Sequence, residues 1–187
     1  LAHHGVLFLD EFPEFTRDTI EALRQPLEDR VITVSRARDT INFPAYFMLV
    51  ATANPCPCGY YGTSKACECM PFQISKYQRK LSGPIIDRID LYVDVQEVPH
   101  RRLLDKTRTE EQSSKVANRI QSARGTQAKR FRTTQKTNAG MSNRDIKALA
   151  HLSDEAKALL DQAAEQLQIS ARSYIRLVKV ARTIADL

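Results

Sequence analysis

Two adjacent carboxylates near the start of the chain have the types and spacing needed for magnesium and water chemistry. Asp10 and Glu11 directly follow the apolar run from Val6 to Leu9, which predicts a strand buried on both faces of a parallel sheet. An aspartate at the carboxyl end of such a strand can hold Mg²⁺, usually through water. The next carboxylate can polarise the water that attacks a γ-phosphate. The pair therefore indicates nucleotide hydrolysis, although an ordinary strand followed by a charged helix start has the same pattern.

A second apolar run ends in the same way. Residues 46–53 predict another buried strand, and Asn54 follows it, just before Pro55. The carboxyl ends of strands are where open α/β sheets bind their ligands, so Asn54 stands where a bound molecule could be contacted. The alternative is that Asn54 only hydrogen-bonds the turn that precedes Pro55.

The four cysteines form a second group of reactive side chains. They occur as two C-x-C pairs separated by eight residues, namely Cys56, Cys58, Cys67 and Cys69. Four thiolates could surround a structural Zn²⁺ tetrahedrally, although the usual pair is C-x-x-C. Reduced thiols in a mobile insertion are the alternative, and reversible disulfides are a third reading that a reducing compartment disfavours.

The residues between the two strands predict the elements that position these groups. Residues 15–30 have the apolar spacing of an amphipathic helix, with Thr16 as its N-cap and Pro26 as a kink or early end. Residues 31–35 and 39–43 are two β-type runs, which predict a hairpin with Arg36 and Arg38 at its tip. This basic tip could grip a phosphate backbone or simply face solvent as a turn.

Basic charge is concentrated in the following part of the chain. Residues 100–136 contain 11 Lys and Arg against 3 Asp and Glu, a local excess of +8, while the whole chain carries +6. The pattern predicts a helix over about residues 110–130 and a linker around 132–140. A solvated helix face is the favoured explanation of this charge, and nucleic-acid contact is the alternative. Further helices are predicted after Ser142, Ser153 and Ser170.

Length and composition restrict the protein class. The chain has 187 residues, of which 42% are hydrophobic, enough for one large domain or two small ones. No apolar run approaches the roughly 20 residues of a membrane span, and the first residues lack the pattern of a signal peptide. We therefore expect a cytoplasmic protein with no membrane partner.

Four ordered segments resemble one family. The strings GVLFLDEFPEF, ANPCPCG, LSGPIIDRIDLYVDV and SARSYIRLVKVARTIADL are similar to those of the magnesium-chelatase-related AAA+ ATPases, specifically the ComM/YifB group. The resemblance runs through nearly the whole chain, and His4, where Asn is expected, is a small departure. It implies an α/β fold: a partial AAA+ P-loop ATPase core whose parallel sheet begins at the Walker B strand, followed by an α-helical lid domain.

The resemblance also implies that the chain is divided into three parts. Residues 1–99 would be the C-terminal part of the ATPase core, with the hairpin at 31–43 and the Cys-rich insertion at 56–69. Residues 100–140 would be a basic helix and linker, and residues 141–187 a helical lid of the magnesium-chelatase C-terminal type.

The same resemblance assigns roles to five residues. Asp10 and Glu11 correspond to the Walker B metal-binding and catalytic carboxylates, and Asn54 to the sensor 1 residue that orients the attacking water. Arg88 corresponds to an arginine finger that reaches the nucleotide of a neighbouring subunit, and Arg172 to sensor 2. Asp10, Asn54 and Arg172 would then bind Mg²⁺ and ATP. Arg88 has a purely structural alternative, a surface ion pair with a neighbouring aspartate such as Asp87 or Asp90.

Three functions follow as alternatives. The first is a ring-forming ATPase, a hexamer in its relatives, that couples ATP hydrolysis to DNA remodelling such as branch migration during recombination. The second is a chelatase-type motor that acts on a protein partner, and the third is a non-enzymatic assembly module. The pattern G-x-x-x-x-G-K-[ST] does not occur in these residues. We therefore expect the phosphate loop to lie upstream and the 187 residues alone to lack ATPase activity.

Overall fold

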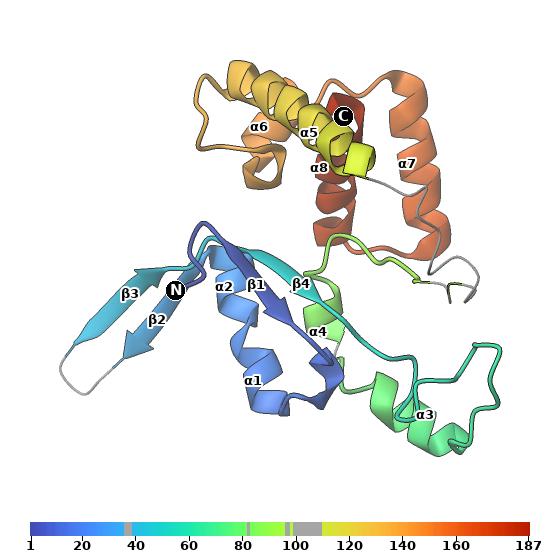
Figure 1. The fold of residues 1–187 in the computed structure, drawn as a ribbon. Helices are drawn as coiled ribbons and strands as arrows, with labels where there is room; N and C mark the ends of the chain where they lie inside the picture. Colours follow the sequence, from blue (N-terminus) through green and yellow to red (C-terminus); the bar gives the residue numbers. More distant parts are fainter. Residues whose placement is uncertain (36–38, 82, 96–97, 99–109) are drawn as a thin grey trace. The chain divides into compact units, whose positions relative to one another are not determined.

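The chain divides into two compact units, Leu1–Tyr92 and Val93–Leu187 (Figure 1). The computed structural model describes residues 1–35, 39–81, 83–95, 98 and 110–187. The first unit mixes strands and helices, in the order β1 (Val6–Leu9), η1 (Phe12–Glu14), α1 (Arg17–Ala22), α2 (Arg24–Asp29), β2 (Val31–Ser35), β3 (Thr40–Pro44), β4 (Met48–Ala51), α3 (Pro71–Gln78) and α4 (Gly83–Ile86). This mixture is compatible with the predicted partial α/β core.

Strands β1 and β4 form a parallel pair in which Leu9 lies opposite Ala51. The predicted strand from Val6 to Leu9 is confirmed, whereas the second strand is shorter than residues 46–53. Leu9 packs against a cluster of buried side chains formed by Phe12, Ile20 and Ile85. The core of the first unit therefore lies on one face of this pair and at the carboxyl end of β1.

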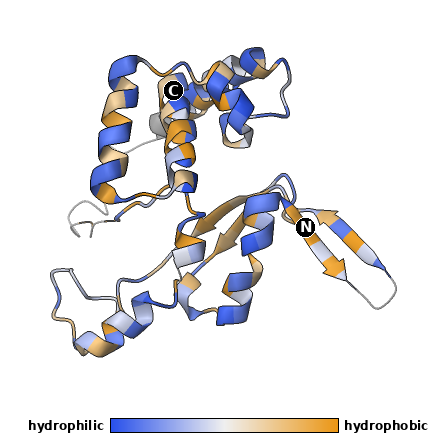
Figure 2. Cartoon of the chain, turned by 180° about the vertical axis from the view of Figure 1, so that it is seen from behind, coloured by the Kyte–Doolittle hydropathy of each residue, from blue (hydrophilic) through white to orange (hydrophobic). Residues whose placement is uncertain are grey.

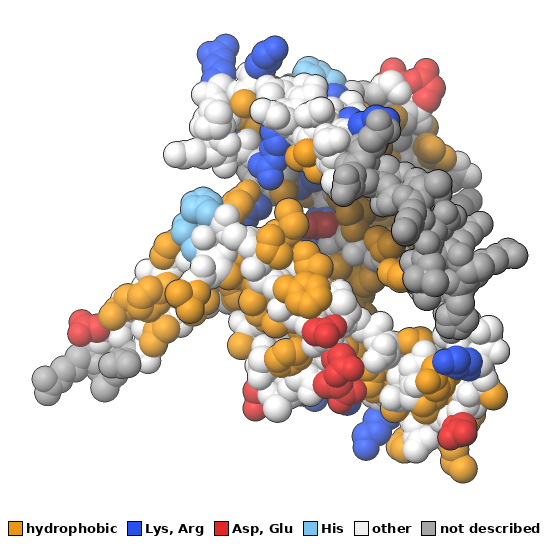
Figure 3. Space-filling model, viewed as in Figure 1, with side chains coloured by type: hydrophobic (Ala, Val, Ile, Leu, Met, Phe, Trp, Pro, Cys, Tyr) orange, Lys and Arg blue, Asp and Glu red, His pale blue; other side chains and the backbone are white. Residues whose placement is uncertain are grey.

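The opposite face of the pair is exposed. Val6 and Phe8 are 59% and 58% exposed, and Met48 and Val50, which lie opposite them, are 58% and 39% exposed. Hydrophobic side chains are accordingly visible at the surface of this unit in Figure 3. The prediction that β1 is buried on both faces is wrong for the described residues, because the buried cluster covers only one side of the two strands.

The predicted helix over residues 15–30 is two short helices, α1 and α2. Thr16 caps α1 as predicted, since its Oγ1 accepts a hydrogen bond from Thr19 N at 3.3 Å. The break lies between Ala22 and Arg24 because Pro26 has no N–H to donate to Ala22, four residues earlier, and its ring would clash with that carbonyl. In the first turn of α2, where no such bond is needed, the same proline is tolerated.

The predicted hairpin is confirmed as antiparallel strands β2 and β3, while its tip residues Arg36 and Arg38 lie outside the described residues. One face carries the apolar pairs Ile32 with Phe43 and Val34 with Ile41, all of them exposed. Hydrophobic and polar residues alternate along both strands (Figure 2).

The polar face of the hairpin is anchored to α2. The Gln25 side chain donates to Thr33 Oγ1 at 3.0 Å and accepts from Thr33 N at 3.2 Å. Thr33 in turn donates to Asn42 Oδ1 on the paired strand at 2.8 Å. These bonds fix the base of the hairpin relative to the helix before it.

The described part of the second unit is helical, with α5 (Glu110–Phe131), η3 (Asn138–Gly140), α6 (Asn143–Leu149), α7 (Asp154–Leu167) and α8 (Ala171–Asp186). The helix predicted over residues 110–130 is confirmed as α5. Ser142, Ser153 and Ser170 are the N-caps of α6, α7 and α8, and each hydroxyl accepts a backbone N–H at 3.2 Å. No described helix is long and apolar enough to cross a membrane.

A buried carboxylate joins the ends of three elements in this unit. Asp186 has a fully buried side chain and accepts from Arg130 at 2.5 and 2.6 Å, from Arg182 at 2.9 Å and from Asn138 at 2.8 Å. Asn138 is also fully buried, so this part of the predicted linker at 132–140 belongs to the packed core. The hydrogen bonds from Arg130, opposed by burial and reinforced by Asn138 and Arg182, hold the pKa of Asp186 well below its usual range.

We predict that Asp186→Asn destabilises the second unit by about 3 kcal/mol at pH 7, because it leaves two arginines without their buried counter-charge. Asp186 has a lower pKa when folded, so its contribution is present above about pH 4 and is lost as the pH falls through the folded pKa. Urea denaturation of the chain, followed by helical circular dichroism at pH 7 and pH 3, measures both effects. The control Glu165→Gln, at an exposed position of α7, should change stability by less than about 0.5 kcal/mol. A difference between wild type and Asp186→Asn that is the same at both pH values would contradict the assignment.

Candidate active site and cysteine cluster

The carboxyl ends of β1 and β4 continue to pair beyond the last residues of the strands. Thr52 N donates to Leu9 O at 3.0 Å, and Phe12 N donates to Thr52 O at 2.8 Å. Asp10 and Glu11 therefore lie beside Thr52, because Leu9 and Phe12, the residues that flank them, are both hydrogen-bonded to Thr52. The structure brings the predicted carboxylates to the edge of the sheet where the second strand also ends.

The side chain of Thr52 contacts both predicted carboxylate residues. Its hydroxyl donates to Asp10 Oδ1 and accepts from Glu11 N at 3.0 Å. Glu11 N also lies 3.2 Å from Asp10 Oδ1. Glu11 adopts a left-handed backbone conformation with φ of 49° and ψ of 47°, which costs a non-glycine residue about 1 to 2 kcal/mol. The hydrogen bonds from Glu11 N and Phe12 N to Thr52 offset this cost and fix the turn.

Thr52 is a site residue that the sequence analysis did not select. The available signal was a hydroxyl residue near the end of the predicted strand at 46–53, which in the structure directly follows β4 as Asp10 follows β1. This signal is weak without the strand register, because threonine is also common inside strands.

Asn54 lies on the same loop, two residues after Thr52, and its side chain is exposed. The loop is held from α3, since Gln78 Nε2 donates to Pro55 O at 3.2 Å. Because β1 and β4 are parallel neighbours, Asn54 and Asp10 leave the sheet at one edge.

Helix α3 also contacts the turn that follows Glu11. Lys80, just beyond α3, forms an ion pair with Glu14 at 3.1 Å. Tyr77 is 5% exposed, and burial together with the negative charge of Glu14 raises the pKa of its phenol. One helix thus packs next to both loops at the edge of the sheet.

Arg88 belongs to the same unit and follows α4. Its side chain is 10% exposed, and its guanidinium forms an ion pair with Glu28 of α2 and donates to Pro84 O. Arg88 is therefore paired with a glutamate distant in the sequence, which the sequence analysis did not consider. In this structure the side chain ties α4 to α2.

Arg172 is the second residue of α8, in the other unit, and is exposed. The structure thus groups Asp10, Glu11, Asn54 and Arg88 in the first unit and Arg172 in the second.

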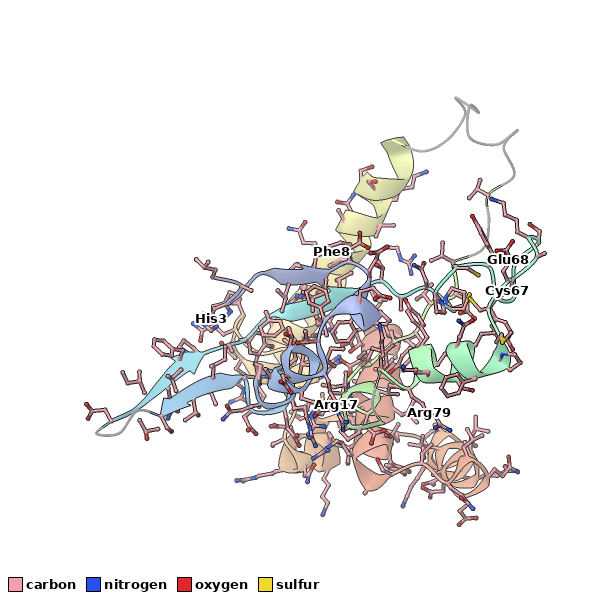
Figure 4. All side chains as sticks on the ribbon, turned by 90° about the horizontal axis from the view of Figure 1, so that it is seen from below. His3, Phe8, Arg17, Cys67, Glu68 and Arg79 are labelled. Carbon is pink, nitrogen blue, oxygen red and sulfur yellow. The ribbon has the colours of Figure 1, made fainter. Side chains whose placement is uncertain are left out.

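The four cysteines cluster in the loop before α3, where Figure 4 labels Cys67. Their sulfur atoms all lie within 4.8 Å of one another. Cys56 Sγ is 3.3 Å from Cys58 Sγ and 3.8 Å from Cys67 Sγ, and the latter two are 3.6 Å apart. A zinc ion with four Zn–S bonds of about 2.3 Å separates tetrahedral sulfurs by about 3.8 Å. The cluster fits this geometry, and its sulfurs are too far apart for the disulfide bond length of about 2.05 Å.

Local backbone groups help to position the cysteine cluster. Tyr61 N donates to Cys56 Sγ at 3.3 Å, and Gly59 and Gly62 supply positive φ values of 81° and 80° where the loop turns. A hydrogen bond from the Tyr60 backbone is the main cause that lowers the pKa of Cys58 to about 6.

The cysteines do not ionise alike. A Cys58 backbone hydrogen bond favours the Cys69 thiolate, yet burial and the neighbouring thiols outweigh it and raise the pKa of Cys69 to about 12. Four close thiolates repel one another, and a bound cation would remove that repulsion.

Comparison with known proteins covers both units. Residues 1–103 match the family described as magnesium chelatase, subunit ChlI, and residues 110–187 match magnesium chelatase, subunit ChlI C-terminal. The chain is 43% identical over 187 residues to the competence protein ComM of Haemophilus influenzae and 43% identical over 188 residues to the uncharacterized protein YifB of Escherichia coli. It is 37% identical over 187 residues to the uncharacterized protein Mb2921c of Mycobacterium bovis.

Each of these alignments includes the whole of this chain, which spans 36% of the length of ComM and YifB and 37% of that of Mb2921c. The matches extend through both units rather than through one motif, and they include the segments that contain Asp10, the cysteines and Arg172. The chain therefore belongs to the magnesium-chelatase-related family that includes ComM and YifB.

Proposed function

We propose that this chain is part of a longer AAA+ ATPase that hydrolyses ATP with Mg²⁺. The observation that carries the proposal is the meeting of Asp10, Glu11 and the Thr52 loop at the carboxyl edge of a parallel strand pair. This is where such sheets bind nucleotides. Asp10 would hold the hydrated Mg²⁺, Glu11 would activate the attacking water, and Asn54 would orient that water.

The two arginines have separate proposed roles. Arg88 would act in trans on the nucleotide of a neighbouring subunit, and Arg172 would contact the nucleotide as sensor 2. A planar guanidinium suits this task because it meets the charge on the phosphate oxygens with several donors. To reach the nucleotide of a neighbouring subunit, Arg88 would have to break its ion pair with Glu28. The ion pair would then belong to the single chain and not to the assembled ring. A ring, a hexamer in this proposal, would then be the active form.

DNA is the proposed substrate of the motor. The support is the relative named a competence protein, together with the hairpin that carries Arg36 and Arg38 between its strands. Basic side chains at such a tip would provide sequence-independent affinity for the phosphate backbone. A motor acting on a protein partner is the second candidate, favoured by the match to magnesium chelatase.

We also propose that the four cysteines bind a structural zinc ion. Its support is the spacing of the four cysteine sulfurs. Four thiolates leave no open position on the metal, so the site would be structural rather than catalytic. It would hold the loop between Asn54 and α3, because Cys56 follows Asn54 by two residues and Pro71 follows Cys69 by two.

For catalysis, we expect Glu11→Gln in the full-length protein to retain ATP binding and to lose at least about 100-fold in turnover, because water activation is removed. Steady-state hydrolysis and nucleotide-binding assays measure the two effects. Glu14→Gln is the matched control, since this exposed carboxylate lies three residues away and pairs with Lys80. Unchanged hydrolysis in Glu11→Gln would sink the assignment of Glu11 as the catalytic carboxylate.

For DNA binding, we expect the double variant Arg36→Ala and Arg38→Ala to weaken affinity and to reduce the dependence of log K on log salt by about 1 to 2. Fluorescence anisotropy with single-stranded and branched DNA at several salt concentrations gives both values. The control is Arg124→Ala with Lys129→Ala, two exposed cations of α5. If the control variant loses as much DNA affinity, the hairpin is not the specific DNA interface. If the wild type does not bind DNA, a protein substrate is favoured.

For the metal, we expect about one zinc per purified chain and none in the double variant Cys67→Ser and Cys69→Ser. Elemental analysis and the thiolate absorption of Co²⁺-substituted protein provide the measurement. Lys65→Ala changes the same loop without removing a thiol and should retain the metal. A wild-type chain that binds neither Zn²⁺ nor Co²⁺ would refute the site.

A further inference from the structure

In the first unit, a single residue, Thr52, makes several hydrogen bonds to the turn that follows β1. Thr52 uses its backbone N–H, its carbonyl and its hydroxyl to contact Leu9, Asp10, Glu11 and Phe12. Only the bonds of the hydroxyl depend on the side chain, because every residue except proline has the same backbone groups. These two bonds are therefore the ones that a choice of residue at position 52 controls.

The hydroxyl orients both carboxylate residues. It donates to Asp10 Oδ1, and Glu11 N approaches the same oxygen at 3.2 Å, so two donors fix the rotation of that carboxylate through a single atom. It also accepts from Glu11 N at 3.0 Å, within the left-handed turn that determines where the Glu11 side chain begins. A hydroxyl is needed for this arrangement because it donates and accepts at once.

We propose that Thr52 is a positioning residue for ATP hydrolysis, which sets the orientation of Asp10 and the backbone turn of Glu11 through its hydroxyl. This inference rests on the proposed function, because it assumes that Asp10 and Glu11 serve Mg²⁺ and the attacking water. Thr52 does not take part in the chemistry itself. It connects the loop that carries Asn54 with the carboxylates, so that the two ends of the site share one hydrogen-bonded frame.

The consequence concerns turnover more than nucleotide binding. Phosphoryl transfer depends on the placement of the metal and the water, and a displacement of about 1 Å can cost about 100-fold in rate. ATP binding would depend mainly on the phosphate loop, which is expected outside these residues.

The test uses Thr52→Val, which keeps the β-branched shape but removes the hydroxyl, and Thr52→Ser, which keeps the hydroxyl, both in the full-length protein. We expect Thr52→Val to lower kcat by about 10- to 100-fold, with ATP affinity changed by less than about threefold and a higher Mg²⁺ concentration needed for half-maximal rate. Thr52→Ser should retain kcat within about threefold. Thr133→Val, which removes an exposed threonine hydroxyl in the second unit, is the matched control and should retain wild-type kcat.

Three results would overturn the inference: wild-type kcat and Mg²⁺ dependence in Thr52→Val, equal losses of kcat in Thr52→Val and Thr52→Ser, or a loss of ATP affinity as large as that of kcat. If Thr52→Val unfolds, which thermal melting detects, the kcat and Mg²⁺ dependence of Thr52→Ser and Thr52→Ala decide between the same alternatives. Glu11→Gln separates this inference from the proposed function. If Glu11→Gln abolishes turnover and Thr52→Val does not change it, only the inference fails. Full activity in Glu11→Gln would remove the catalytic role of Glu11, and an absence of ATP hydrolysis by the wild type would remove the proposed ATPase.

Discussion

The parallel pairing of β1 with β4 is the constraint on which the candidate site depends. Parallel strands end at the same edge, and here the pairing extends one residue further, to Thr52 and the turn from Leu9 to Phe12. Without that register, Asp10 and the Asn54 loop would be two unrelated polar segments 44 residues apart in the sequence. The two hydrophobic strands thus do more than fill a core, because their alignment determines which polar groups meet.

The elements around this pair support the same edge of the sheet. Phe12 and Ile20 pack under the carboxyl end of β1, and Lys80, just beyond α3, forms an ion pair with Glu14 in the turn after Glu11. The cysteine cluster lies between the Asn54 loop and α3, so a metal there would restrain the loop from its far end. In the second unit a buried network around Asp186 has a comparable structural role, since it connects α5, η3 and α8 through charge and hydrogen bonds.

Local sequence patterns predicted the elements well where a single chemical rule decides. The run from Val6 to Leu9, the hairpin and the N-caps Thr16, Ser142, Ser153 and Ser170 are all found at the predicted positions, because the apolar patterns of strands and hydroxyl capping act within a few residues. The predictions were less accurate where competing rules meet. Pro26 divided one predicted helix into two by its effect on Ala22, and burial of Asn138 placed part of a predicted linker in the core.

The sequence by itself determined the family of this chain, the candidate carboxylates Asp10 and Glu11, and the grouping of the cysteines, because these are carried by residue identity and spacing. Only the tertiary structure decided that the four sulfurs approach within 4.8 Å, that Arg88 pairs with Glu28, and that Thr52 holds the turn of Glu11. The physical reason is that these contacts join residues between 2 and 60 positions apart through side-chain geometry. Such geometry depends on strand register and packing, which neighbouring residues in the sequence do not specify.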